Sequence, residues 1–306
     1  MESVYSTLTY WLVNHPNIAN FTWTEGETLG STVFFVSGVV TAYLSATFLL
    51  RHVMVSLPSL SPRILKPITA VHSLILCLLS LTMAVGCTLS LASSSDIVPS
   101  HPTARFFRAI CLPMDVKPSG PLFFWAQVFY LSKILEFGDT LLIILGKSFQ
   151  RLSFLHVYHH AVVVIMCFLW LRTQQSMFPF GLVANSTVHV IMYGYYFLCA
   201  VGMRPKWKRL VTDCQVLQFL LSFAFGGWMF QEHVFGSGCS GFRACAFNGV
   251  FNASLLALFF NFRSKNYANK TRLDTWAEMI KDVGWVIFRI RTQTLPEKHE
   301  LKSEPK

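Results

Sequence analysis

Residues 67–93 read PITAVHSLILCLLSLTMAVGCTLSLAS, a stretch that contains no Lys, Arg, Asp or Glu. About 20 apolar residues are enough for a helix to cross the hydrocarbon core of a bilayer. Only helices and closed barrels satisfy their backbone hydrogen bonds in lipid, and this stretch is too long and too continuously apolar for a barrel strand. It therefore predicts a membrane-spanning helix.

The rest of the chain has the same character. It is 53% hydrophobic and only 13% charged, whereas soluble domains carry about 25% charged residues. The sequence predicts an all-α integral membrane protein with seven transmembrane helices. Their approximate bounds are 30–50, 67–93, 121–145, 156–171, 178–200, 211–232 and 244–262.

These spans divide the chain into three parts. Residues 1–29 are expected to be a lumenal N-terminal segment, residues 30–262 the transmembrane catalytic region, and residues 263–306 a cytosolic tail. Within the tail, residues 272–290 alternate charged with apolar side chains and could form an amphipathic helix on the membrane surface.

Basic residues indicate the orientation. Most of the 25 Lys and Arg residues fall in the first, third and fifth connections and in the tail. The positive-inside rule then places the N-terminus in the lumen and the C-terminus in the cytosol. Asn20 begins a glycosylation sequon on the proposed lumenal side. Because the net charge of +10 is concentrated between apolar stretches, it favours contact with lipid headgroups over nucleic-acid binding.

Two of the eight cysteines lie in proposed lumenal connections, where disulfides persist. We predict that Cys111 and Cys239 pair, with Cys245 as a rival partner and two free thiols as the alternative. The cysteines within the apolar stretches are expected to be buried hydrophobic side chains.

Polar side chains follow helical spacing in two spans that are adjacent in sequence. The third span contains KILEFGDT, in which steps of three and four place four polar side chains on one face. They are Lys133, Glu136, Asp139 and Thr140. The fourth span opens with HVYHH, whose histidines share a face: His156, His159 and His160. Ionisable groups inside a membrane mark function by default, although Lys133 and Glu136 could also form a purely structural ion pair.

Two further spans carry polar stripes. The fifth span contains NSTVHVIMYGYY, in which Asn185, His189 and either Met192 or Tyr193 share a face. The sixth span opens with Thr212, Gln215 and Gln218 at steps of three, which could merely join helices in lipid. If the four faces converge, they form a polar chamber in the cytosolic half of the bundle, suited to a substrate with a charged head and an apolar tail.

Taken together, the four motifs resemble those of the ELO family of very-long-chain fatty acid elongases. The family patterns KxxExxDT, HxxHH, NxxxHxxMYxYY and TxxQxxQ occur in this order, and the resemblance covers roughly residues 30–265. It implies a seven-span protein of the endoplasmic reticulum, with six spans around a closed-ended substrate tunnel. The tail ends in LKSEPK and lacks the dilysine retrieval signal of many members.

The resemblance also implies the reaction. A 3-ketoacyl-CoA synthase condenses malonyl-CoA with a long-chain acyl-CoA and releases CoA and CO2, with no bound cofactor and no metal. Its partners would be the ketoacyl-CoA reductase, hydroxyacyl-CoA dehydratase and enoyl-CoA reductase of the elongation cycle. Whether the protein forms a homo-oligomer, and which acyl chains it prefers, the sequence leaves open.

A histidine is the best candidate nucleophile, because the polar sets contain no cysteine except Cys214, which faces away from Gln215 and Gln218. The resemblance favours His159, with His156 and His160 orienting it, binding the head group or moving protons. His189 would hold the second substrate or stabilise its enolate. Asn185 and Gln215 would donate to developing negative charge. Glu136 and Asp139 would fix imidazole tautomers.

Two other functions fit parts of the sequence. A membrane di-iron desaturase or hydroxylase also uses histidine boxes, but it needs more ligands than His156, His159, His160 and His189 supply. A transporter also contains intramembrane charges, but it is expected to show an internal repeat, and none is apparent.

Overall fold

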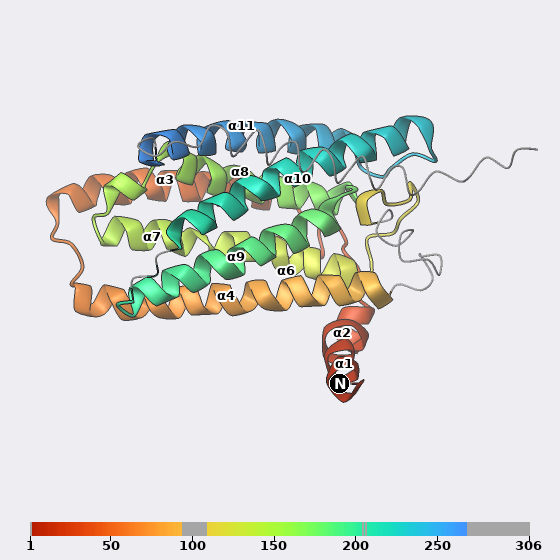
Figure 1. Cartoon of the computed structure of the whole chain (residues 1–306), viewed down its shortest axis with the longest axis horizontal. Helices are drawn as coiled ribbons and strands as arrows, with labels where there is room; N and C mark the ends of the chain where they lie inside the picture. The colour runs from red at the N-terminus through yellow and green to blue at the C-terminus, as the bar shows by residue number, and fades with distance from the viewer. Residues whose placement is uncertain (1, 94–108, 204, 206, 268–306) are drawn as a thin grey trace, which may run out of the picture. The chain divides into compact units, whose positions relative to one another are not determined.

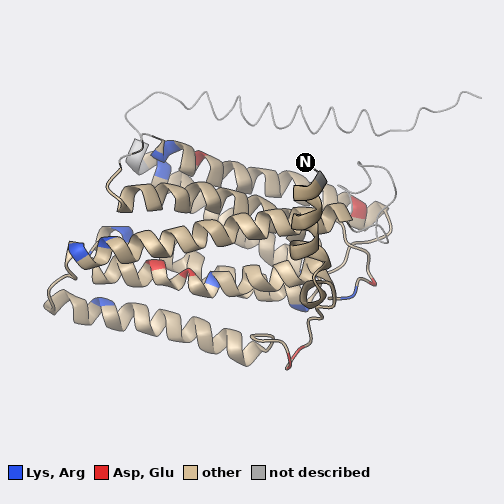
Figure 2. Cartoon of the chain, turned by 90° about the horizontal axis from the view of Figure 1, so that it is seen from below, with Lys and Arg blue, Asp and Glu red and all other residues tan. Residues whose placement is uncertain are grey.

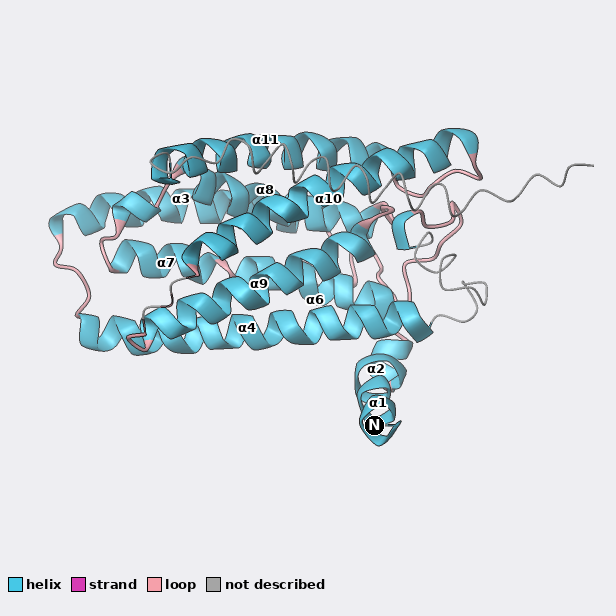
Figure 3. Cartoon of the chain, viewed as in Figure 1, coloured by secondary structure: helices cyan, strands magenta, loops and turns pink. Residues whose placement is uncertain are grey.

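The chain folds into long α-helices, as its apolar stretches predict. A computed structural model describes residues 2–93, 109–203, 205 and 207–267. The long helices are α3 (Val33–Ser56), α4 (Pro62–Ser93), α6 (Pro121–Leu135), α7 (Phe137–Leu145), α8 (Phe154–Arg172), α9 (Phe178–Ala200), α10 (Lys208–Phe235) and α11 (Phe242–Tyr267). Figures 1 and 3 show them joined by loops. The one β-bridge among the described residues pairs Thr22 with Ser119.

The chain divides into two compact units, Met1–Phe260 and Asn261–Lys306. All the contacts described below lie within the first unit. The amphipathic helix predicted over residues 272–290 lies outside the described residues.

Five of these helices are long and apolar enough to cross a membrane, so the protein is a multi-pass membrane protein. They are α3, α4, α8, α10 and α11. The other two predicted spans correspond to α6 with α7, and to α9. The first is divided into two shorter helices, and the second carries the polar stripe of Asn185 and His189, which lowers its hydropathy.

The division of the third predicted span is a difference from the sequence expectation of one continuous helix. Helix α6 ends at Leu135, Glu136 stands between the helices, and α7 begins at Phe137. The amide of Asp139 donates to the carbonyl of Glu136 at 3.0 Å, a tighter turn than an α-helix has. Gly138, a weak helix former, follows the break, and a Cβ there would lie 2.5 Å from Cε1 of His72.

The observed helices are longer than several of the predicted spans. Helix α3 continues past Arg51 to Ser56, and α4 begins at Pro62 and contains Pro67, where we expected the helix to begin. A hydropathy criterion finds only the part of a helix that fits in hydrocarbon, whereas the helix itself can extend into the interface. Pro67 lies in the second turn of α4, where it removes one intrahelical hydrogen-bond donor.

Helix α4 packs along α9, and α6 packs against α4 and α8, as Figure 1 shows. Gly86 of α4 permits the close approach of α6, because a Cβ at this position would collide with the indole of Trp125. The largest hydrophobic core cluster is centred on α6 and α8 and includes Phe123, Phe129 and Trp170. The rings of Phe129 and Trp170 stack with centroids 5.5 Å apart.

The N-terminal segment is attached to α6. It contains α1 (Glu2–Thr9), a π-helical turn (Tyr10–Asn14) and α2 (Pro16–Ala19). Nε1 of Trp125 donates to the carbonyl of Leu12 at 2.9 Å, and the hydroxyl of Tyr130 donates to the carbonyl of Gly30 at 3.0 Å. The segment that the sequence placed outside the membrane region is thus packed and hydrogen-bonded.

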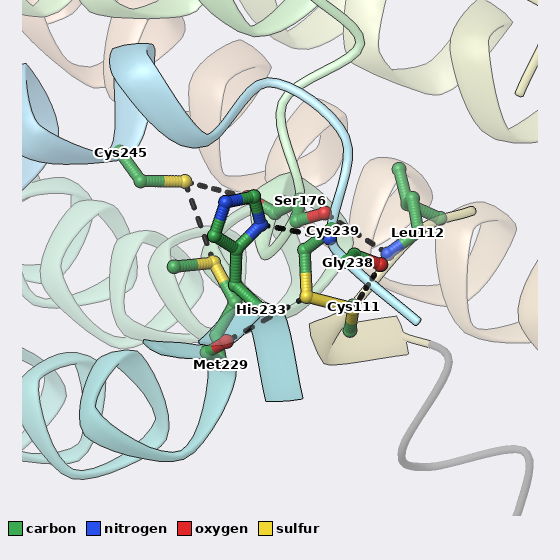
Figure 4. Close-up of a disulfide and its surroundings, with 8 residues drawn as sticks. All are labelled: Cys111, Leu112, Ser176, Met229, His233, Gly238, Cys239 and Cys245. Atoms are coloured by element: carbon green, nitrogen blue, oxygen red, sulfur yellow. Dashed lines mark hydrogen bonds between the residues drawn. A yellow bond between two sulfur atoms is a disulfide. The ribbon is translucent and has the colours of Figure 1, made fainter. Parts of the chain in front are cut away.

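Cys111 and Cys239 form a disulfide, the pairing proposed from the sequence. It joins the segment before α6 to the connection between α10 and α11 (Figure 4). Nδ1 of His233 accepts from the amide of Cys239 at 2.9 Å. The rival partner, Cys245, is a free thiol whose Sγ lies 3.5 Å from Sδ of Met229.

Basic residues are concentrated at one end of the first unit. The α3–α4, α7–α8 and α9–α10 connections and the adjoining helix ends carry Arg51, Arg63, Lys147, Arg151, Lys208 and Arg209. Basic residues gather at the left end of the helices in Figure 2, while the helix interiors contain few charges. We call this the basic end. The disulfide lies toward the opposite end of α10, and we call that the disulfide end.

Candidate active site

The buried charges of the KILEFGDT segment meet the polar stripe of α9. Nζ of Lys133 lies 2.7 Å from Oε1 of Glu136, donates to Oδ1 of Asn185 at 3.1 Å, and lies 3.4 Å from Nδ1 of His189. The same His189 nitrogen lies 3.3 Å from Glu136 Oε1. Lys133 and Glu136 are only 1% and 2% exposed. Such burial is tolerated only because each charge has a close partner of opposite sign and further hydrogen bonds.

This network continues to α10. Nδ2 of Asn185 donates to Oε1 of Gln218 at 3.4 Å. Lys133, Glu136, Asn185, His189 and Gln218 therefore link the α6–α7 junction, α9 and α10. The predicted convergence of these three polar stripes is thus present in the fold.

A second branch leaves the same segment through Asp139. Its Oδ2 accepts from the Tyr193 hydroxyl at 2.7 Å, and its Oδ1 lies 3.3 Å from Nε2 of His72. Asp139 thus links α7 to α9 and α4. We expected Asp139 to fix the tautomer of an imidazole, and the imidazole that it contacts is that of His72 on α4.

A third branch passes through Thr140. Its Oγ1 lies 2.8 Å from Nε2 of His156 and 3.0 Å from the hydroxyl of Tyr43. The group that fixes the orientation of His156 is therefore a threonine hydroxyl from the neighbouring helix. Residues 133–140 together form the polar hub of the molecule, with branches to α3, α4, α8, α9 and α10.

The HVYHH histidines have different surroundings, although they lie on one helix. His160 is 6% exposed, and its ring centroid lies 4.4 Å from that of His156 and 5.2 Å from that of His159. Nδ1 of His160 and Oε2 of Glu136 have no hydrogen-bond partner among the described residues. His159 is the only one of the three that faces the cavity described next.

A cavity of about 380 Å³ lies beside His159. Near this histidine its wall includes Asn185 and Gln218, the two amides at the end of the hub network. The remaining wall is largely apolar and comes mainly from α8, α9, α10 and α11. It continues to Met229 and Cys245 near the disulfide end. The cavity thus joins a reactive polar group to a long apolar chamber.

The sixth span contributes less than expected. Nε2 of Gln215 donates to Sδ of Met192 at 3.4 Å, so it contacts α9 without reaching the buried charges. Thr212 is 6% exposed and lies outside the hub network, so far as the described residues show. Phe223 of the same helix lines the cavity, whereas Phe225 and Trp228 pack against the smaller cluster around Ile110 and Met229.

His72 and Tyr43 are site residues that the sequence analysis missed. His72 lies 3.3 Å from Asp139, and Tyr43 contacts Thr140. His72 is the only Lys, Arg, His, Asp or Glu in the stretch 67–93, and that isolation inside an apolar helix was itself a signal. Tyr43 is one tyrosine in an apolar helix, and no spacing distinguishes it.

The described residues contain no group of three or more His, Cys, Asp or Glu arranged to hold a metal ion. The hub instead pairs cation with carboxylate and hydroxyl with imidazole.

Comparison with known proteins identifies the family to which this chain belongs. The family described as "ELO: GNS1/SUR4 family" matches residues 28–275. The chain belongs to the ELO family. It is an ELO-family fatty acid elongase, a 3-ketoacyl-CoA synthase, and this membership decides against the desaturase and transporter alternatives.

The relatives of this ELO protein are distant ones. It is 29% identical over 268 residues to "Fatty acid elongase 3-like" of Arabidopsis thaliana, covering 85% of this chain and 92% of that one. It is 32% identical over 261 residues to "Fatty acid elongase A" of Dictyostelium discoideum, with 84% and 91% covered. A shorter match, 39% identical over 150 residues, covers 47% of this chain and 48% of "Very long chain fatty acid elongase 5" of Xenopus tropicalis.

Proposed function

We propose that this elongase condenses malonyl-CoA with a long-chain acyl-CoA to give a 3-ketoacyl-CoA two carbons longer, through an acyl group carried by His159. The observation that carries the proposal is the position of His159 in the wall of the cavity. There, one imidazole lies between the amides of the polar hub and an apolar chamber long enough for an acyl tail. His156 and His160, by contrast, contact the hub and each other.

In the first step an imidazole nitrogen of neutral His159 attacks the thioester carbonyl. The carbon–sulfur bond breaks, the other ring nitrogen loses its proton, and CoA leaves as the thiol. In the second step malonyl-CoA loses CO2, and the electron pair of the broken carbon–carbon bond forms an enolate. The enolate carbon attacks the acyl carbonyl, the carbon–nitrogen bond breaks, and a proton restores His159.

The hub supplies the electrostatics of the second step. His189 is held between Lys133 and Glu136, close to Asn185, which lines the same cavity as His159. We assign to Asn185 and His189 the stabilisation of the enolate oxygen, because fixed donors in a water-poor site stabilise developing charge most strongly. Asn185 can serve in this role because Lys133 binds its Oδ1, and its Nδ2 has a second N–H besides the one that it donates to Gln218.

The residues at the basic end are suited to bind the phosphates of CoA. Lys147, Arg151, Lys208 and Arg209 lie in connections that meet there, and Arg and Lys side chains bind phosphate through charge-assisted hydrogen bonds. The head group would remain outside while the acyl tail enters toward the disulfide end. Thr212 and Gln215 would support α9 and α10 without contacting substrate.

The cellular setting is part of the proposal. We place the protein in the endoplasmic reticulum with seven spans, six of them around a closed-ended tunnel, a lumenal N-terminal segment over residues 1–29 and a cytosolic tail over residues 263–306. The concentration of basic residues at one end supports a cytosolic basic end. The disulfide at the other end supports a lumenal disulfide end. The partners would be the ketoacyl-CoA reductase, the hydroxyacyl-CoA dehydratase and the enoyl-CoA reductase of the cycle.

The test is the intact mass of the purified protein after incubation with long-chain acyl-CoA alone. We expect a gain of one acyl group with release of free CoA, abolished in His159→Ala. His52→Ala, which changes an exposed histidine of α3, is the matched control and should be acylated normally. An adduct of unchanged amount in His159→Ala would reject His159 as the nucleophile.

A second assay tests the reaction itself. With labelled malonyl-CoA and a panel of acyl-CoAs, the wild type should give a labelled 3-ketoacyl-CoA. A product without a covalent adduct would preserve the condensation and discard only the acyl-imidazole route.

A further inference from the structure

The part of the cavity distant from His159 contains polar atoms in an otherwise apolar wall. Its lining includes Trp170, Gln175 and Asn248. In the part of the chain that the structure describes, three buried atoms of these residues have no hydrogen-bond partner, namely Trp170 Nε1, Gln175 Oε1 and Asn248 Oδ1. Buried polar atoms are almost always hydrogen-bonded, because leaving one unpaired is costly.

These residues lie at the disulfide end. Trp170 follows His159 on α8 by 11 residues, a distance of about 16 Å at the helical rise. Gln175 follows α8, and its backbone N–H donates to the carbonyl of Trp170 at 3.0 Å. The side chain of Gln175 interacts with the Cys245 thiol. Asn248 lies one turn after Cys245 on α11. The three polar side chains therefore belong to the same end of the cavity.

Gln175 and Trp170 are held firmly there. They are 1% and 4% exposed. A Cβ at Gly241 would lie 2.4 Å from the Cα of Gln175, so the α10–α11 connection packs directly against the backbone of this residue. Neither side chain can reach bulk solvent to satisfy its polar atom.

The unpaired set comprises two acceptors, the amide oxygens of Gln175 and Asn248, and one donor, the Trp170 indole N–H. A hydroxyl group both donates one hydrogen bond and accepts others, so it can pair with the indole and with one amide oxygen simultaneously. A methyl group can do neither. We propose that this end of the cavity binds a hydroxyl group at or near the terminus of the acyl chain, and that the elongase accepts hydroxylated acyl-CoAs.

This inference rests on the proposed function, because it assumes that the acyl tail extends from His159 along the cavity. It adds a determinant of substrate choice that acts at the end of the acyl chain farthest from the thioester. A pocket built to hydrogen-bond a hydroxyl discriminates against the analogue that lacks it, since the polar groups of the pocket are then left unpaired.

The experiment measures binding without requiring turnover. The probes are acyl-CoA thioethers, which lack the reactive thioester carbonyl, made as pairs of equal length that end in a methyl or in a hydroxymethyl group. Their dissociation constants are measured on the full chain in detergent over a series of lengths. At the length that reaches the disulfide end, we expect the hydroxyl-ended probe to bind more tightly than its methyl-ended partner.

Variants test the assignment of residues. In Gln175→Leu the preference for hydroxyl over methyl should fall about tenfold, the equivalent of one hydrogen bond. Trp170→Phe, which keeps an aromatic ring and removes the donor, should lower the preference similarly and serves if Gln175→Leu does not fold. Phe180→Leu is the matched control, because Phe180 lines the same cavity without a polar atom. It should affect both probes equally.

The outcomes separate the two proposals. A preference that is unchanged in both variants, or a wild type that binds the methyl-ended probe at least as tightly at every length, would overturn this inference, since ordered water alone would then satisfy the polar atoms. Elongation of methyl-ended substrates would continue in that case and leave the proposed function intact. Binding with the expected preference but without condensation would overturn the proposed function alone, and no binding of either probe at any length would overturn both.

Discussion

The polar hub and the disulfide end of the cavity both bury polar groups, but they differ in the charge and in the pairing of those groups. In the hub the groups are charged, and Lys133 and Glu136 pair with each other and with His189, although Oε2 of Glu136 has no partner among the described residues. At the disulfide end the groups are neutral, and within the described part of the chain one polar atom each of Trp170, Gln175 and Asn248 has no hydrogen-bond partner. A charge inside a membrane protein must be neutralised by the fold itself. Burying a neutral amide or indole without a partner costs less free energy than burying an unpaired charge. Such a group can therefore remain available to bind a ligand.

The comparison therefore predicts that substitutions in the hub will be much more costly than substitutions at the disulfide end. The largest effect is expected for Lys133→Met, which leaves the buried Glu136 carboxylate without its cation and with only His189 beside it. This loss should destabilise the fold by about 3–5 kcal/mol. Thermal unfolding in detergent measures it. The double variant Lys133→Met with Glu136→Met removes both charges and should recover much of the loss. If it were less stable than the single variant, the charges would not be a compensating pair.

At the disulfide end, a covalent bond links the segment before α6 to the connection between α10 and α11. Replacing Cys111 and Cys239 by Ser together should lower stability by about 2–4 kcal/mol, because the bond closes a long loop in the unfolded chain, with a sequence separation of 128. Cys199→Ser, which changes an exposed free cysteine, is the matched control and should leave the unfolding temperature unchanged. Equal unfolding temperatures for the double variant and the wild type would show that packing alone holds this end.

A smaller effect is expected for Tyr193→Phe. The variant removes the donor to Asp139, and a hydrogen bond to a charged group contributes about 1.5–3 kcal/mol. Tyr158→Phe provides the comparison, because the Tyr158 hydroxyl bonds the neutral Ser254 hydroxyl at 2.8 Å and should cost only about 0.5–1.5 kcal/mol. A loss from Tyr158→Phe as large as that from Tyr193→Phe would argue against an ionised Asp139 in the hub.

The smallest effect is expected at the disulfide end itself. Gln175→Leu replaces an incompletely paired amide by an apolar group of similar size, so it should change stability by less than about 1 kcal/mol, or raise it. The same unfolding assay in the absence of ligand decides this. A loss of the size expected for Lys133→Met would mean that Gln175 has structural partners and would remove the contrast between the two ends.

The hub was largely predictable because its residues repeat at helical spacing. Lys133, Glu136 and Asp139 share a face at steps of three, and intramembrane ionisable groups are rare enough to be noticed. The residues on neighbouring helices that each branch of the hub contacts were not predictable. Asp139 was expected to contact an imidazole, but no spacing identified that imidazole as His72 or predicted the hydrogen bond from Tyr193.

The disulfide end was not predictable in the same way. Trp170, Gln175 and Asn248 lie on α8, after α8 and on α11, so no local pattern connects them. Cys111 and Cys239 could be paired from their expected compartment, but Cys245 remained a rival until the connection between α10 and α11 was placed.

The sequence by itself determined that this protein is helical, embedded in a membrane and a member of the ELO family, because hydropathy and helical periodicity are local properties of the chain. It also determined which faces of the helices are polar. Only the tertiary structure decided which side chains meet, that His159 alone of its motif faces the cavity, and that polar atoms at the far end find no partner among the described residues. Those features depend on how helices distant in sequence rotate and pack against one another, and spacing along one helix carries no information about the face that its neighbour presents.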